Sequence, residues 1–178
     1  MSWELGEKQV IFEGRKLRLE LHHLRDDDNG KRATMEIVAH PGAVVVLPLL
    51  ADDNVVLIRN KRHAVNQILI ELPAGTLDRN ELPMNAAGRE LLEETGYLAG
   101  KIQPLATFFT SPGILSEKMF AFVARDLEKK HQSLEEGEEI ELLERTWEQT
   151  MDMVRHGQIA DGKSIATLLL YERFFREK

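Results

Sequence analysis

The sequence predicts an α/β/α sandwich of the α+β class, a mixed β-sheet between helices, preceded by a small antiparallel β subdomain. Continuous apolar runs follow Gly42 and are typical of strands buried on both faces. Strand-like and helix-like segments are interspersed without regular alternation, which favours a mixed sheet over a doubly wound parallel sheet. Before Gly42 the pattern is one of polar-faced strands, which indicates a separate, smaller unit.

The N-terminal residues 1–41 alternate apolar and polar positions. The pattern in residues 9–23 is interrupted at Glu13-Gly14 and predicts a hairpin, and Asn29-Gly30 suits the turn of a second hairpin. These strands carry too few apolar residues for a core of their own. We therefore expect residues 1–41 to pack on the main domain, residues 42–178, or on a second copy of the chain.

The main domain is expected to begin with two buried strands separated by the turn "ADDN". A third strand leads to a turn at Ala74-Gly75 and a loop. Pro83 suits the first helical position and Gly96 suits a left-handed C-cap, although Leu82 is a weak N-cap. The expected strands lie within 43–50, 55–60, 67–73, 106–127 (two strands joined by Ser-Pro-Gly) and 137–147, and the expected helices within 83–96, 149–157 and 164–175.

Composition excludes several classes of function. The net charge of -7 offers no basic surface for nucleic acid, so we expect no nucleic-acid partner. Without cysteine the chain has no disulfide, thiolate metal site or cysteine nucleophile. The polar start "MSWELGEKQV" lacks a signal-peptide core, and no apolar run is long enough for a membrane span. We expect a cytoplasmic protein with no membrane association.

Three glutamates share one face of the helix expected at 83–96. Glu90, Glu93 and Glu94 stand at positions i, i+3 and i+4, where like charges each weaken a helix by about 0.2–0.5 kcal/mol. A divalent cation such as Mg²⁺, which takes oxygen ligands, would offset this repulsion. Arg89 can reach Glu93 at i+4 and orient it. The alternative from composition alone is a solvated acidic face.

The spacing around the glutamates is more specific than their number. Five residues separate Gly75 from Glu81 and seven separate Glu81 from Arg89-Glu90; apolar Leu91, then Glu93-Glu94, Gly96 and apolar Tyr97 follow. This pattern resembles the signature of the Nudix hydrolases, which bind magnesium and cleave a nucleoside diphosphate linked to another moiety. Seven fixed identities in one register arise by chance with a probability below about one in a million.

The resemblance implies a metal site and its supporting residues. Glu90 and Glu94 would be the main ligands, Glu93 would assist, and the backbone carbonyl of Ala74 would be a further ligand. The cofactor would be Mg²⁺, with Mn²⁺ as a substitute. The motif positions implied to be structural are Gly75, Glu81, Arg89 and Gly96.

The resemblance also implies a general base outside the helix. In the ADP-ribose pyrophosphatases of this family the base is a glutamate on a loop between later strands. The matching region here is "LEEGEEIELLE", in which Glu138 aligns best and Glu139 is next. An ordinary solvated acidic turn remains the alternative for each of them.

The segment after the motif is similar to the branch of the family that acts on ADP-ribose and other nucleoside diphosphate sugars. Pro112 lies fifteen residues beyond Tyr97, as in that branch, although a turn proline is the alternative. The similarity implies that Arg62 pairs with the diphosphate, with Arg59 a weaker candidate, and that Glu71 contacts the nucleoside or ribose. The remaining implied substrate contacts are Ser111 and Glu117.

The implied function is metal-dependent hydrolysis of ADP-ribose or another nucleoside diphosphate sugar to a nucleoside monophosphate and a sugar phosphate. The alternatives are a pyrophosphatase for GDP-mannose or another hexose nucleotide, an enzyme for a dinucleoside polyphosphate or an oxidised nucleotide, and a non-hydrolytic ADP-ribose sensor. In that branch an N-terminal strand domain is exchanged between two subunits, which implies a homodimer. Phe12 or Trp3 would then stack on the base, with a place in the hairpin's own packing as the alternative for Phe12.

Overall fold

The computed structural model describes residues 3–176 and divides into two compact units. The first contains the N-terminal residues through Gly42 together with Phe109–Lys118, and the second contains Ala43–Phe108 with the residues from Met119 onward. The segment Phe109–Lys118 therefore leaves the second unit and returns to it. It is joined to the end of the third strand by hydrogen bonds from Val38 N to Ile114 O, at 2.8 Å, and from Ser116 N to Val38 O, at 3.0 Å.

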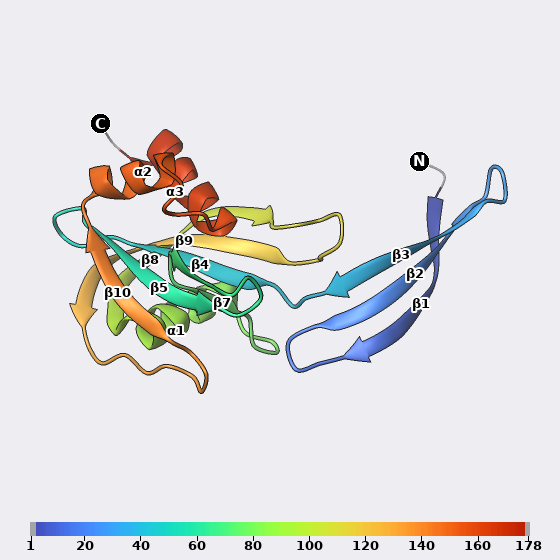
Figure 1. Cartoon of the computed structure of the whole chain (residues 1–178), viewed down its shortest axis with the longest axis horizontal. Helices are drawn as coiled ribbons and strands as arrows, with labels where there is room; N and C mark the ends of the chain where they lie inside the picture. Colours follow the sequence, from blue (N-terminus) through green and yellow to red (C-terminus); the bar gives the residue numbers. More distant parts are fainter. Residues whose placement is uncertain (1–2, 177–178) are drawn as a thin grey trace. The chain divides into compact units, whose positions relative to one another are not determined.

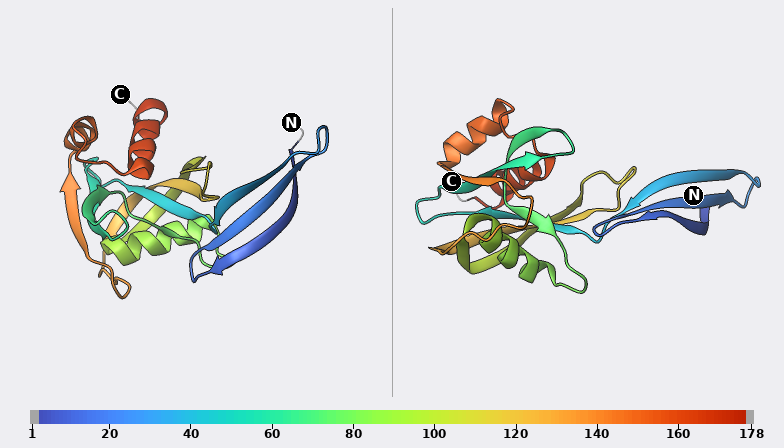
Figure 2. Two further views of the ribbon diagram at one scale, coloured as in Figure 1. Left: turned by 45° about the vertical axis from the view of Figure 1, so that its right-hand side comes forward. Right: turned by 60° about the horizontal axis from the view of Figure 1, so that its bottom comes forward.

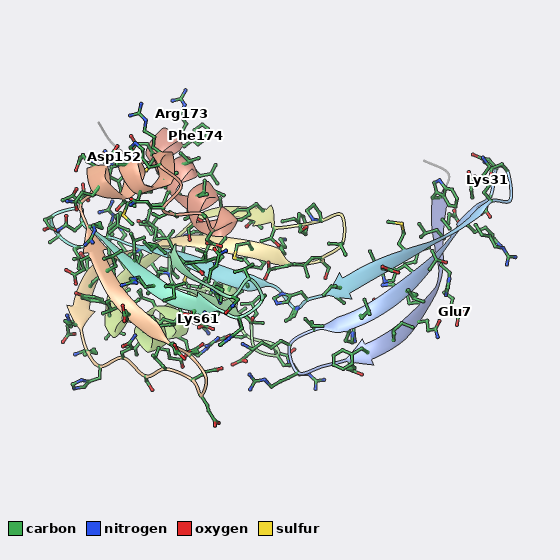
Figure 3. All side chains as sticks on the ribbon, in the orientation of Figure 1. Glu7, Lys31, Lys61, Asp152, Arg173 and Phe174 are labelled. Atoms are coloured by element: carbon green, nitrogen blue, oxygen red, sulfur yellow. The ribbon has the colours of Figure 1, made fainter. Side chains whose placement is uncertain are left out.

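The first unit is a three-stranded antiparallel sheet of β1 (Trp3–Glu13), β2 (Arg18–Asp26) and β3 (Arg32–Ala39), in that order. Both predicted hairpin turns are confirmed, because Glu13 pairs with Arg18 and Gly30 takes a positive φ of 70° at the second turn. Every residue of β1 is exposed. Figure 3 shows side chains on both sides of these strands, with Glu7 labelled on β1.

The second unit contains seven strands in two sheets and three helices within the described residues. One sheet has the order β10-β5-β6 and the other β7-β4-β9-β8. Since β4 runs parallel to β9 and antiparallel to β7, the second sheet is mixed, as predicted. The bounds are β4 (Ala43–Pro48), β5 (Val55–Arg62), β6 (Gln67–Glu71), β7 (Ala74–Thr76), α1 (Pro83–Thr95), β8 (Tyr97–Phe109), β9 (Lys118–Lys129), β10 (Ile140–Arg145), α2 (Trp147–Arg155) and α3 (Gly162–Phe174).

Within the second unit the helices lie on both sides of the sheets (Figures 1 and 2). On one side Ala86, Ala87 and Leu91 of α1 pack against Val44 and other apolar residues of β4 and β9. On the other side α2 and α3 cover a larger core that contains Trp147, Met153, Leu168 and Tyr171. The α+β class is thus confirmed. No helix among residues 3–176 is long and apolar enough to cross a membrane.

Three details differ from the sequence prediction. The strands form two sheets instead of one central sheet. The segment after Ala74 is a short strand, β7, because Ala74–Thr76 pairs with Ala43–Val45 of β4. Strand β8 begins directly after Gly96, well before the apolar stretch at Ala106 that predicted it. In each case pairing with a partner distant in the sequence decided the structure, and local propensity did not reveal it.

The ends of α1 agree with the prediction. Pro83 occupies the first turn after Leu82, which makes no side-chain cap, and Gly96 is the left-handed C-cap with φ 69°. The segment after β9 covers this end: Lys130 N donates to Gly96 O at 2.6 Å and Ser133 N donates to Glu93 O at 2.9 Å. The side chain of Gln132 donates to Glu94 O at 2.6 Å. The loop after β9 is therefore fastened to the helix that carries the acidic stripe.

Gly96→Ala tests this fastening. A methyl group at Gly96 would lie 2.8 Å from Gln132 N, and the positive φ alone costs a non-glycine residue about 1–2 kcal/mol. Gly157→Ala is the matched control, because Gly157 has φ 70° and no atom within 4 Å of the added methyl group. We expect Gly96→Ala to lower the free energy of unfolding in urea by at least about 1 kcal/mol more than Gly157→Ala. Equal losses would contradict the packing of residues 130–133 on Gly96.

Candidate active site

Helix α1 presents the acidic stripe on the side away from its packing face. Because Ala86, Ala87 and Leu91 face β4 and β9, the same turns direct Glu90 and Glu94 toward β7 and the loop before the helix. Glu94 is only 3% exposed. The predicted helical arrangement of the three glutamates is therefore realised, but with one carboxylate buried and not simply solvated.

Arg89 holds three carboxylates with one guanidinium group. Its Nε and Nη2 donate to the two oxygens of Glu81 at 3.0 and 2.9 Å. Its Nη1 donates to Glu90 at 2.8 Å and to Glu93 at 3.0 Å. These bonds raise the pKa of Arg89 above its usual range, with Glu81 the largest cause. The contact between Arg89 and Glu81 joins the loop after β7 to α1, which is the geometry expected of structural motif residues.

Gly75 lies in contact with the carboxylate of Glu90. A Cβ atom at this position would stand 1.9 Å from the carboxyl carbon of Glu90, a separation that no side chain can adopt. The glycine therefore permits a close approach of backbone and carboxylate. Next to it, Ala74 N donates to Glu94 Oε2 at 2.8 Å. The backbone of Ala74-Gly75 and the side chains of Glu90 and Glu94 thus meet at one place.

Negative charge exceeds positive charge at this place. Burial raises the pKa of Glu94 to about 8; the bond from Ala74 N and the charge of Arg62 oppose the shift, while Glu90 and Glu138 add to it. Burial also raises the pKa of Glu90, and Arg89 acts in the opposite direction. The same two carboxylates therefore lack a full set of cationic partners within the protein.

The donor set fits a hard divalent cation. Carboxylate and carbonyl oxygens are the ligands of Mg²⁺ and Mn²⁺, and the absence of a side chain at Gly75 lets the Glu90 carboxylate lie against the backbone there. Within residues 3–176, no three carboxylate or imidazole groups are already gathered as a cation cage. Glu90 and Glu93 both accept hydrogen bonds from Arg89. A cation bound by Glu90 must share it with Arg89.

The acidic loop before β10 approaches the stripe. Glu138 contributes to the raised pKa of both Glu90 and Glu94, so its carboxylate lies within electrostatic range of them. Its Oε2 also accepts a hydrogen bond from Glu135 N at 2.9 Å. Glu139 is tied through its backbone, because its carbonyl accepts a hydrogen bond from Lys61 N at 3.4 Å. Of the two candidates for the base, the structure brings Glu138 toward the glutamates of α1.

Arg62 and Glu71 are brought together as an ion pair. The Nε and Nη2 of Arg62 donate to the two oxygens of Glu71 at 2.8 and 2.6 Å. Glu71 has no exposed surface, and Lys163 at the start of α3 donates to its Oε2 at 2.6 Å. A direct contact between Glu71 and a nucleoside has no support in this geometry. Arg62 keeps 38% of its side chain exposed and remains free to meet a ligand.

Lys163 was missed by sequence reasoning. Glu71 ends an apolar strand, and a buried carboxylate requires cationic or hydrogen-bonding partners. That signal predicts a partner but does not identify it, because Lys163 lies 92 residues further along the chain.

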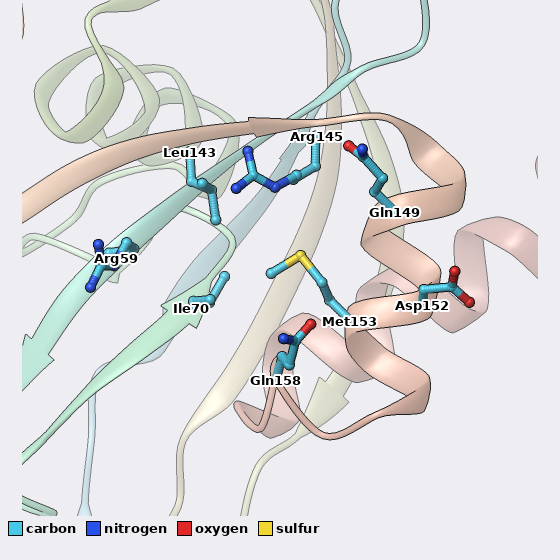
Figure 4. Close-up of a pocket in the computed structure, with 8 residues that line it drawn as sticks. All are labelled: Arg59, Ile70, Leu143, Arg145, Gln149, Asp152, Met153 and Gln158. Atoms are coloured by element: carbon cyan, nitrogen blue, oxygen red, sulfur yellow. The ribbon is translucent and has the colours of Figure 1, made fainter.

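Arg59 lies on the other face of β5. Strand residues alternate between faces, so Arg59 shares a face of β5 with Leu57, which packs in the core covered by α2 and α3, while Arg62 shares the opposite face with Ile58. Arg59 pairs with the exposed Glu141 at 3.2 Å. It also lines a pocket of about 520 Å³ whose walls include Arg145 of β10 and Met153 of α2 (Figure 4). The structure does not bring Arg59 together with the acidic stripe.

Ser111 and Glu117 belong to the first unit. The backbone carbonyl of Ser111 accepts hydrogen bonds from Ile114 N and Leu115 N, which closes the turn predicted at Ser111-Pro112-Gly113. Glu117 accepts a hydrogen bond from Thr110 Oγ1 at 2.7 Å. Their contact with substrate stays a prediction.

Comparison with known proteins shows the family of the chain. The family model described as "NUDIX domain" matches residues 39–168. The chain is 35% identical over 159 residues to an ADP-ribose pyrophosphatase of Bacillus subtilis, which covers 88% of this chain and 85% of that protein. A methanol dehydrogenase activator of Bacillus methanolicus is similar to the same extent. A GDP-mannose pyrophosphatase of Salmonella typhimurium is 37% identical over 71% of each chain.

The solved structures give the same fold. A crystal structure of an ADP compounds hydrolase matches 98% of this chain and 94% of its own, with a TM-score of 0.85 and 24% sequence identity. These observations define the class of the protein: it has a Nudix fold and an intact acidic motif. The chain belongs to the Nudix family, whose hydrolases generally need a divalent metal.

Glu94→Gln tests the burial of charge beside Gly75. The folded-state pKa of about 8 lies above the ordinary value of 4.5, so the metal-free folded protein holds a proton that the unfolded chain releases within this window. Its stability therefore falls as the pH rises from 4.5 to 8. Glutamine removes the charge and keeps an acceptor for Ala74 N. We expect the metal-free variant to be more stable than the wild type by a few kcal/mol at pH 8, and by less than about 1 kcal/mol at pH 5.

The measurement is urea unfolding in a chelator at both pH values. Glu141→Gln, on an exposed side chain, is the control and should change stability little at either pH. A variant Glu94→Gln that is no more stable than the wild type at pH 8 would contradict the burial of an uncompensated carboxylate.

Proposed function

We propose that this protein hydrolyses the pyrophosphate bond of ADP-ribose, or of a closely related nucleoside diphosphate sugar, to a nucleoside monophosphate and a sugar phosphate. The observation that carries the proposal is the similarity to the Bacillus subtilis ADP-ribose pyrophosphatase over 88% of the chain. The acidic stripe beside Gly75 supports the same reaction type, because phosphoryl chemistry needs hard cations held by oxygen ligands.

The cofactor in this proposal is Mg²⁺, with Mn²⁺ as a substitute. Glu90, Glu94 and the Ala74 carbonyl would hold it, and Glu93 would assist from the position in which Arg89 orients it. When bound, such a cation neutralises the diphosphate and lowers the pKa of a coordinated water. Arg89 and Glu81 are bonded to each other beside the ligands, and Gly75 lets the Glu90 carboxylate approach the backbone of Ala74-Gly75.

Glu138 is the general base that we propose. The attacking water forms a new P–O bond, Glu138 takes its proton, and the bridging P–O bond breaks with its electron pair left on the departing phosphate. The electrostatic proximity of Glu138 to Glu90 and Glu94 supports this assignment over Glu139. Base catalysis of this kind is typically worth about 10²–10⁴ in rate.

Arg62 is the residue that we propose for the diphosphate. A guanidinium group is suited to phosphate oxygens, and 38% of the Arg62 side chain is exposed. Its charge also acts on Glu94 of α1. Glu71 would act indirectly by holding Arg62, which replaces the direct nucleoside contact expected from the sequence.

Two other functions are weaker candidates. The Salmonella relative favours GDP-mannose or another hexose nucleotide as substrate, although it matches a smaller share of the chain. A non-hydrolytic ADP-ribose sensor is disfavoured, because all seven fixed positions of the motif are intact in this sequence.

We also propose that the protein is a homodimer in which residues 1–41 contact the second copy. Among residues 3–176, β1 is an edge strand that pairs with β2 alone, and its apolar side chains, including Trp3, Val10, Ile11 and Phe12, are 43–58% exposed. An unpaired edge strand with apolar side chains is stabilised when another chain covers it.

The substrate is tested with Mg²⁺ and a panel of ADP-ribose, GDP-mannose and other nucleoside diphosphate sugars. Release of phosphate by alkaline phosphatase from the products reports cleavage. We expect the highest kcat/KM with ADP-ribose, and no activity on any member of the panel would reject the enzymatic proposal.

The same assay separates the roles of the glutamates. Glu138→Gln should lower kcat by about 10²–10⁴ without weakening Mn²⁺ binding, measured by electron paramagnetic resonance. Glu139→Gln is the neighbouring control and should remain near the wild type. The reverse result would move the base to Glu139.

The oligomeric state is tested by sedimentation equilibrium at micromolar concentration. For the wild type we expect twice the chain mass of 20.3 kDa. For Phe12→Glu, which introduces a charge on the exposed edge strand, we expect the mass of a single chain. A single-chain mass for the wild type would reject the dimer.

A further inference from the structure

The carboxylate of Glu71 is shared between two cations from different parts of the second unit. Arg62 at the end of β5 donates to both oxygens, and Lys163 in the first turn of α3 donates to Oε2 at 2.6 Å. Glu71 is fully buried, and the side chain of Lys163 is only 13% exposed. A buried ionic group of this kind needs every partner, because an unpaired charge in the interior is costly.

The first turn of α3 is itself fixed in place. Asp161 caps the helix by accepting from Ser164 N at 3.0 Å, and its other carboxylate oxygen contacts Lys163 at 2.9 Å. Ser164 Oγ in turn accepts a hydrogen bond from Leu72 N at 2.8 Å. The start of α3 is therefore hydrogen-bonded to residues 71 and 72. These residues directly precede the backbone of Ala74-Gly75, which contacts Glu90 and Glu94.

The charges of this group balance. Arg62 and Lys163 are positive, and Glu71 and Asp161 are negative. Since Glu71 divides its hydrogen bonds between two cations, Arg62 is not fully neutralised by it. Without Lys163, the charges of Arg62, Glu71 and Asp161 would add up to one net negative charge. This net negative charge would repel an incoming diphosphate.

We propose that Lys163 is a positioning residue for diphosphate binding, which acts by holding Glu71 so that the guanidinium group of Arg62 stays oriented and available to phosphate oxygens. The proposal rests on the proposed function for its substrate. It assigns to Lys163 an effect on the binding of the diphosphate and none on the metal ligands or the general base, with which Lys163 has no hydrogen bond or ion pair among the described residues.

The test compares Lys163→Met with Lys163→Arg and with Lys101→Met. Lys101 is an exposed lysine of β8, so its variant has the same change in net charge without the ion pair. Inorganic pyrophosphate is titrated into metal-free protein by calorimetry, and KM and kcat are measured with ADP-ribose. We expect Lys163→Met to weaken pyrophosphate binding and to raise KM by at least about tenfold, with kcat within about twofold of the wild type.

Lys163→Arg and Lys101→Met should leave the pyrophosphate affinity and KM near the wild-type values. A double-mutant cycle tests whether Lys163 acts through Arg62. If it does, the double variant Arg62→Ala with Lys163→Met should bind pyrophosphate no more weakly than Arg62→Ala alone. Unchanged pyrophosphate affinity in Lys163→Met, a lowered kcat with unchanged KM, or additive effects in the cycle would each overturn the proposal.

Asp161→Asn keeps the proposal testable if Lys163→Met does not fold. Asparagine caps a helix as well as aspartate, and this change removes one negative charge beside Lys163. We expect pyrophosphate to bind more tightly by a few-fold, and unchanged or weaker binding would overturn the proposal. If the wild type binds pyrophosphate but cleaves no nucleoside diphosphate sugar, the proposed function fails while the calorimetry still decides the role of Lys163.

Discussion

The interaction on which the site depends is the contact of one guanidinium group with three carboxylates. Arg89 binds Glu81, Glu90 and Glu93 at 2.8–3.0 Å, and these bonds join the loop after β7 to the largely buried acidic side of α1. Each glutamate alone would repel its neighbours on the helix. With Arg89 between them, the stripe becomes a stable part of the fold whose remaining negative charge is directed toward Gly75.

Two buried carboxylates in the second unit, those of Glu71 and Glu94, differ in the partners that the protein provides for them. Glu71 has two cationic partners and is fully satisfied within the protein. Within the described part of the chain, the carboxylate of Glu94 has the N–H of Ala74 as its one hydrogen-bond partner, and burial together with the neighbouring Glu90 and Glu138 raises its pKa to about 8. The first arrangement is that of a structural anchor. The second is that of a ligand whose partner comes from outside the chain, as the proposed cation would.

Local signals in the sequence predicted a large part of this structure. The turns at Glu13-Gly14 and Asn29-Gly30 and the limits of α1 at Pro83 and Gly96 depend on residues close together in the chain, so they could be recognised directly. The motif with fixed spacing indicated that Gly75 is structural, but its close contact with Glu90 is seen only in the structure.

What could not be predicted depends on partners far apart in the sequence. The three residues Ala74–Thr76 became a strand because β4 lies beside them, and no local propensity indicates that. Strand periodicity alone separates Arg59 from Arg62 by face, but only the structure shows that the charge of Arg62 acts on Glu94 of α1. The pairing of Lys163 with Glu71 spans 92 residues, and any lysine or arginine would have satisfied the same rule.

The loop that carries Glu138 is anchored at both of its ends. Ser133 N is bonded to Glu93 O at the end of α1, and Ile140 is paired with Asn60 of β5. Residues 134–139 therefore form a short tether whose reach is set by its length, since an extended chain spans about 3.3–3.6 Å per residue. In the proposed role of Glu138 as the base, insertions or deletions in this segment would change how far its carboxylate reaches and would leave the motif residues unaltered.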